Sequence, residues 1–149
     1  MRTWALISLL MVTSVTAVAR KEESLENLKA RVASANPDQR IGLCLEIAER
    51  QLTAADKLYN DGNVDQARAA LDDIVAYSEK ARDAANQSGK KLKNAEISVR
   101  KMASKLRDMK RTLNFEDQPP VQEAIDHLER VRSDLLARMF GNGKESKEK

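Results

Sequence analysis

Side chains that could carry out acid–base, nucleophilic or metal chemistry are few in this sequence, and their spacing brings no complete set together. His127 is the only histidine and Cys44 the only cysteine, so neither a Ser-His-Asp nor a Cys-His set has support. Glu123 precedes His127 by one helical turn, but two ligands are too few for a four-coordinate zinc site. Cys44 is expected to be a small, buried apolar residue. We therefore expect no catalytic, cofactor-binding or metal-binding residues, and a protein that is not an enzyme.

One group of charged residues stands out, and it is basic. Nine lysines and arginines lie between residues 90 and 111, against only Glu96 and Asp108. Three of them recur every seven residues, which places them on one face of a helix. Such a face could contact an anionic surface, for example lipid head groups or an envelope polysaccharide. The residues of this predicted basic stripe are Lys93, Arg100, Lys101, Arg107 and Arg111.

The alternative is that the basic stripe is only a solvated helix face. Acidic residues of the last predicted helix could neutralise part of it, because long helices commonly carry interleaved charges. No aromatic residues accompany the stripe for base stacking, so nucleic acid is not expected as a partner. The acidic residues concerned are Glu123, Asp126, Glu129 and Asp134.

Helices must position these residues, because the composition favours them along the whole chain. Only five glycines and three prolines occur, and aromatic residues make up 3% of the sequence. After residue 19, apolar side chains recur at three- and four-residue spacing, and alternating strand-like runs are absent. The pattern predicts an all-α fold without β-sheet. Helices are expected over about residues 22–35, 38–61, 64–114 and 119–140.

The third of these segments carries the most information. From Val64 to Leu113 the three- and four-residue spacing is unbroken, and it continues through Gly89. This favours one long central helix, with segments 38–61 and 119–140 folded back on it as antiparallel hairpins in an elongated bundle. A break near Gly89 is the alternative, because glycine often ends a helix.

The first residues have the pattern of a secretory signal peptide. Arg2 precedes an apolar run from Trp4 to Val15, and small residues follow before the charged segment that begins at Arg20. The run is shorter than the roughly 20 apolar residues that a spanning helix needs. We therefore expect a signal peptide at 1–19, a helical domain at 20–140 and a disordered charged tail at 141–149. The mature protein should be periplasmic or secreted and should have no transmembrane helix.

Residues 48–81 resemble a tetratricopeptide repeat. Ala55, Gly62 and Ala67 stand where that family has small residues at the helix contact and near the turn, while Gln51 and Glu79 depart from its pattern. The resemblance implies a helical hairpin that binds protein. Together with the absence of a catalytic set, it predicts a non-enzymatic exported module that binds a protein partner or itself. The alternative function is binding of an anionic envelope surface through residues 93–111.

Overall fold

A computed structural model describes residues 23–145, which form five α-helices and a short 3-10 helix. No strand occurs in this part of the chain, so the predicted all-α fold is confirmed. The predicted signal peptide at 1–19 and the end of the predicted tail at 146–149 lie outside the described residues. The helices are α1 (Leu25–Ser34), α2 (Pro37–Asn60), α3 (Val64–Ser88), α4 (Leu92–Thr112), η1 (Phe115–Asp117) and α5 (Gln118–Glu145).

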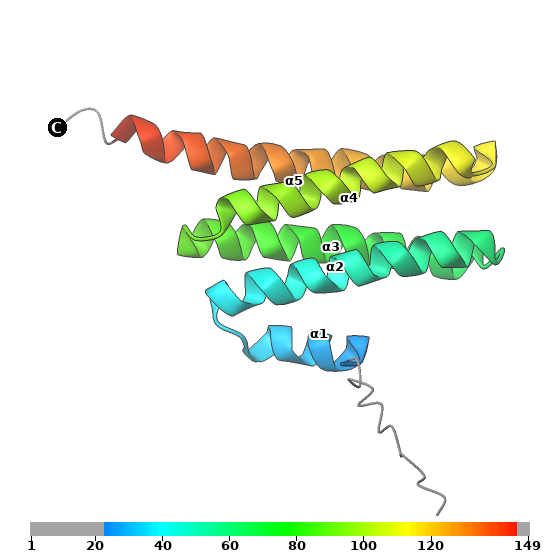
Figure 1. Ribbon diagram of the computed structural model, residues 1–149, viewed down its shortest axis with the longest axis horizontal. Coiled ribbons are helices and arrows are strands. Elements are labelled where there is room, and N and C mark those ends of the chain that lie inside the picture. The colour runs from blue at the N-terminus through cyan, green and yellow to red at the C-terminus, as the bar shows by residue number, and fades with distance from the viewer. Residues whose placement is uncertain (1–22, 146–149) are drawn as a thin grey trace, which may run out of the picture.

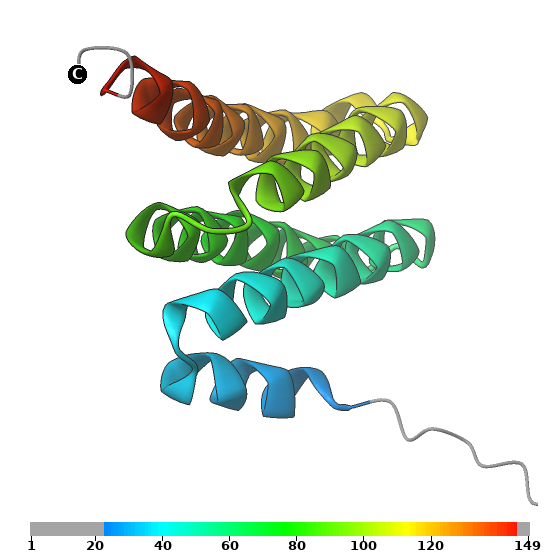
Figure 2. The same cartoon turned by 60° about the vertical axis from the view of Figure 1, so that its left-hand side comes forward.

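Two antiparallel hairpins are stacked on each other in the fold. Helices α2 and α3 make the first hairpin, and α4 and α5 make the second. Helix α4 lies beside α2 and α5 lies beside α3, so α2 and α4 share one face of the molecule (Figures 1 and 2). Helix α1 packs against α2, on the side of the first hairpin that faces away from the second hairpin.

The core of the stack combines large aliphatic residues with alanines. Ile47, Ile74 and Leu128 are fully buried, and Ala55 and Ala67 are fully buried as well. Because alanine has only a methyl side chain, such positions allow the backbones of neighbouring helices to approach closely. The apolar residues at three- and four-residue spacing therefore face one continuous core.

Cys44 belongs to this core and is fully buried, as the sequence predicts. Burial raises the pKa of its thiol to about 11, so the thiol is protonated at neutral pH. A protonated, enclosed thiol behaves as an apolar side chain rather than as a nucleophile.

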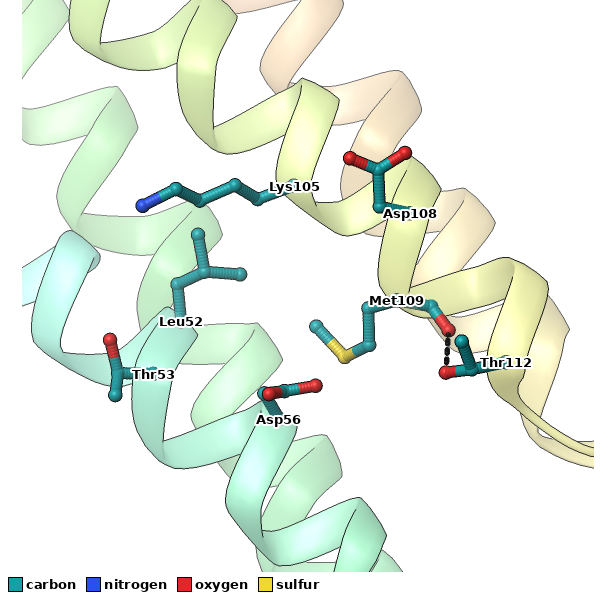
Figure 3. A pocket seen from close by; sticks show the side chains of 7 residues that line it. All are labelled: Leu52, Thr53, Asp56, Lys105, Asp108, Met109 and Thr112. Atoms are coloured by element: carbon teal, nitrogen blue, oxygen red, sulfur yellow. Dashed lines mark hydrogen bonds between the residues drawn. The ribbon is translucent and has the colours of Figure 1, made fainter.

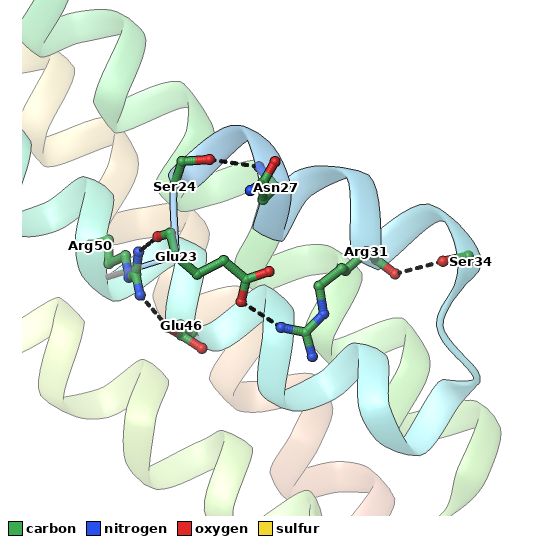
Figure 4. Close-up of polar contacts among 7 residues, drawn as sticks. All are labelled: Glu23, Ser24, Asn27, Arg31, Ser34, Glu46 and Arg50. Carbon is green, nitrogen blue, oxygen red and sulfur yellow. Dashed lines mark hydrogen bonds and ion pairs between the residues drawn. The ribbon is translucent and has the colours of Figure 1, made fainter. Parts of the chain in front are cut away.

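Helix α1 is fastened to α2 by a small polar cluster (Figure 4). The Ser24 side chain accepts a hydrogen bond of 3.2 Å from the backbone N–H of Asn27 and so caps the start of α1. Arg50 on α2 donates to the backbone oxygen of Glu23 and also to the Glu46 carboxylate. The start of α1 is thus fixed to the middle of α2 (Figure 4).

The predicted continuous helix over 64–114 is wrong, and the alternative break near Gly89 is confirmed. Helix α3 ends at Ser88, and Gly89 has a φ of 68°, in the left-handed region that ends many helices. Lys91 has a φ of 56°, which is costly for a residue with a Cβ. Between these two positions the chain reverses, so the molecule has two stacked hairpins and no long central helix.

The end of the last helix also differs from the prediction. Helix α5 continues through Gly141 to Glu145, so residues 141–145 are helical rather than a disordered tail. A glycine costs only about 1 kcal/mol relative to alanine inside a helix, and extending an existing helix needs no new nucleation. Among the helices of residues 23–145, none combines enough length with the apolar character that a bilayer crossing needs.

Candidate functional site

A groove of about 360 Å³ lies between α2 and α4, on the face that these two helices share (Figure 3). Leu52 from α2 and Met109 from α4 are buried and form its apolar floor. The other lining side chains are exposed and polar, so the groove is shallow and open to solvent. They are Thr53, Asp56, Lys105, Asp108 and Thr112.

Polar contacts join α2 to α4 and to the linker that precedes α4, on the amino-terminal side of the groove. Lys90 forms an ion pair of 2.9 Å with Asp38, and Ser98 donates a 2.8 Å hydrogen bond to Glu49. The hydrogen bond from the Lys90 ammonium lowers the pKa of the Asp38 carboxyl below its ordinary value. Further along the two helices these contacts stop and the groove begins.

Two charged side chains of the groove have no partner. In the described part of the chain, neither the Asp56 carboxylate nor the Lys105 ammonium makes a hydrogen bond or an ion pair. Asp108 pairs with Arg111 at 3.3 Å. Figure 3 shows Lys105 and Asp56 on different sides of the space between the two helices. The groove therefore offers an ammonium and a carboxylate beside an apolar floor.

Two residues of the predicted basic stripe, Arg100 and Arg107, take part in ion pairs with acids of α4 and α5. Glu96 is 7% exposed, accepts a 2.8 Å hydrogen bond from Arg132 and forms an ion pair of 3.4 Å with Arg100. Glu129 pairs with Arg132 at 3.5 Å and also with Arg107. These five residues form an alternating chain of charges, which we call the α4–α5 ion-pair chain. Two of the stripe arginines are therefore already neutralised within the molecule.

The remaining stripe residues are more available. Arg111 is exposed and pairs with Asp108, on its own helix. Lys93 and Lys101 are exposed and have no ion pair among the described residues. The structure thus brings Arg100 and Arg107 together with acids of α4 and α5 and leaves the two lysines free.

Only one of the four acidic residues expected to neutralise the stripe has an ion pair with it. Glu129 pairs with Arg107, as predicted. Asp134 instead pairs with Arg82 of α3 at 3.0 Å, because it lies on the flank of α5 that faces α3. Neither Glu123 nor Asp126 has an ion pair with a stripe residue within residues 23–145.

A second groove, also about 360 Å³, lies on the opposite side between α3 and α5. His127 and Glu123 line it together with Glu79, and His127 Nδ1 lies 3.5 Å from Glu79 Oε1. Within residues 23–145 no group of three His, Cys, Asp or Glu side chains is placed to hold a metal ion. The arrangement is a histidine–carboxylate pair at a helix contact.

Comparison with protein-family models, curated proteins and solved structures finds no match to this chain. The resemblance of residues 48–81 to a tetratricopeptide repeat therefore stays a prediction from the sequence. The antiparallel hairpin that this resemblance implies is present as α2 and α3, but antiparallel packing is common to many helical folds.

Proposed function

We propose that the protein is a non-enzymatic, exported interaction module that binds a protein segment in the groove between α2 and α4. The unpaired charges of Asp56 and Lys105 beside the apolar floor carry this proposal. Export is supported by the amino-terminal pattern of residues 1–19. A partner that supplies an apolar side chain, a cation and an anion would cover the apolar floor and pair with Asp56 and Lys105.

The shape of the groove favours a protein over a small molecule. Small-molecule sites bury most of the ligand surface in a concave, largely apolar pocket. Here only Leu52 and Met109 are buried among the seven lining residues. A side chain presented by a partner would cover this floor, and its surrounding residues would exclude water from the rim.

A photocrosslinking amino acid in place of Thr53 should trap the partner in the native compartment, because Thr53 lies on the groove rim. The same amino acid in place of Ser133, which is exposed on α5, is the matched control. We expect a protein adduct from position 53 that disappears when Asp56→Lys and Lys105→Glu are added. Equal adducts from positions 53 and 133, or none from position 53, would contradict the proposal.

A second candidate function is binding of an anionic envelope surface. The exposed, unpaired ammonium groups of Lys93 and Lys101 favour it. The engagement of Arg100 and Arg107 with Glu96 and Glu129 weakens it, because paired arginines contribute less to an attractive field.

Vesicle sedimentation separates this second function from the first. If the lysines bind anionic lipid head groups, Lys93→Glu with Lys101→Glu should weaken salt-sensitive binding to phosphatidylglycerol vesicles roughly tenfold or more. Lys57→Glu with Lys80→Glu, on α2 and α3, is the matched control and should bind nearly as the parent does. If both double variants bind equally, the two lysines have no such role.

A further inference from the structure

Two large apolar side chains are exposed in the described part of the chain, and the stack itself does not explain them. Phe115 is 85% exposed and Phe140 is 71% exposed. Phe115 lies in η1, which joins α4 to α5 at one end of the second hairpin. Exposure of a whole phenylalanine costs hydration free energy, and exposed aromatics commonly serve as anchors in protein interfaces.

The segment that carries Phe115 is held in a defined conformation. The backbone N–H of Asp117 donates to the carbonyl of Asn114 at 3.0 Å, and the Gln118 side chain donates to the carbonyl of Leu113 at 3.1 Å. The Asp117 carboxylate lies 3.9 Å from Arg68 on α3. Phe115 is therefore presented by an ordered turn, which reduces the entropy that binding would otherwise cost.

The charges around Phe115 complement those of the groove. Glu116 follows it directly, and Arg111 precedes it by about one helical turn; both are exposed. The groove carries the opposite arrangement, with the unpaired Lys105 ammonium and the unpaired Asp56 carboxylate beside its apolar floor. Arg111 is paired with Asp108, but an ion pair between such exposed groups contributes little to stability and can rearrange.

Phe140 fits the groove less well. Within four residues on either side of it, the only charged residues are Arg138 and Lys144. A segment with basic residues alone would leave Lys105 without an acidic partner. The charge pattern therefore selects Phe115 among the two exposed phenylalanines.

We infer that Phe115 of a second copy of this chain occupies the groove. This inference rests on the proposed function of the groove as a protein-binding site. The phenyl ring packs on Leu52 and Met109, Glu116 pairs with Lys105, and Arg111 pairs with Asp56. Thr112 of the groove lies three residues before Phe115, so the groove and the aromatic side chain share one end of the molecule. Two copies can then exchange this contact reciprocally and form a closed dimer.

Sedimentation of the mature chain tests the inference. The wild-type chain should show a concentration-dependent monomer–dimer equilibrium. Phe115→Ser should weaken it at least about 30-fold, which is the effect of losing an interface anchor residue. Phe140→Ser is the matched control and should leave the equilibrium unchanged. Circular dichroism should show the same fold for both variants, because both phenylalanines are exposed.

A mixing experiment identifies the two sides of the contact. A Phe115→Ser copy keeps its groove, whereas an Asp56→Lys, Lys105→Glu copy keeps its Phe115. Each variant alone should be monomeric at concentrations where the wild type is dimeric. Mixed together, with one of them fluorescently labelled, they should form a heterodimer, because one complete contact remains. Its affinity should lie between that of the wild-type dimer and that of either variant alone.

Three outcomes would overturn the inference: a wild-type chain that is monomeric up to about 1 mM, loss of dimers in Phe140→Ser but not in Phe115→Ser, or no heterodimer in the mixture. If one of these occurs while the Thr53 crosslink still traps a different protein, self-association is wrong and the proposed function stands. If the Thr53 crosslink traps no protein at all, the proposed function itself fails.

Discussion

Replacing Gly89 and Lys91 with alanine, in a chain that also carries Phe115→Ser, should convert the monomer into a domain-swapped dimer. Both positions have left-handed backbone conformations, and Gly89→Ala introduces there a cost of about 1–2 kcal/mol that a continuous helix would avoid. Residue 91 bears this cost as lysine and as alanine alike. The apolar spacing is continuous from Val64 to Leu113. Helices α3 and α4 can therefore join into one helix without moving any of these apolar residues to another face. The two hairpins of one chain would then pack against those of another.

Size-exclusion chromatography with light scattering would measure the outcome, since a swapped dimer exchanges slowly and persists on dilution. The matched control is Lys91→Gly, because glycine accepts the positive φ at residue 91. This control should remain monomeric and be at least as stable as its parent. A double alanine variant that stays monomeric and merely unfolds at a lower urea concentration would show that packing between the hairpins outweighs the preference of the linker.

Replacing Leu128 with alanine should lower the free energy of unfolding by about 2–5 kcal/mol. Leu128 is fully buried on α5, the helix that packs against both α3 and α4, so its truncation leaves a cavity in the region where the two hairpins meet. For a domain of this size such a loss is a large fraction of the total stability. Urea unfolding followed by circular dichroism gives the value directly.

Arg130→Ala is the matched control for this substitution. Arg130 lies two residues away on α5, is exposed and has no ion pair among the described residues. Its replacement should change the stability by less than about 0.5 kcal/mol. If the two variants unfold at the same urea concentration, Leu128 does not pack in the core as described.

Periodicity predicted most of the fold but not the reversal at Gly89. Apolar spacing indicates which side of each helix faces the core. Because α3 and α4 face the same core, their apolar residues keep the same spacing across the linker. That spacing does not indicate whether the backbone between the two helices stays helical. Gly89 was the local signal for the break, and its left-handed conformation confirms that reading. At the other end of the chain, Gly141 did not stop α5, because a single glycine weakens a helix without preventing it.

The candidate site was harder to predict, because its two walls come from helices far apart in the sequence. Leu52 and Met109 fall at the three- and four-residue apolar spacing, but nothing in the spacing shows that they lie at the edge of the core and beneath a shared groove. Asp56 and Lys105 stand out only once α2 and α4 are placed side by side. Glu96 is a similar case, since one acid among many basic residues gave no sign of being a buried partner of Arg132.

The α4–α5 ion-pair chain has a consequence for how this architecture can grow. Helix α5 turns its Asp134 and His127 flank toward α3, and the ion-pair chain occupies the other flank, away from the first hairpin. A third hairpin packed on this flank would have to remove Glu129 and the exposed Arg100 and Arg107 from water, which costs free energy even for paired ions. Lengthening the stack would first require apolar replacements along this flank. The charged flank thus disfavours a third hairpin, in the way that the polar outer face of a terminal repeat does in a solenoid.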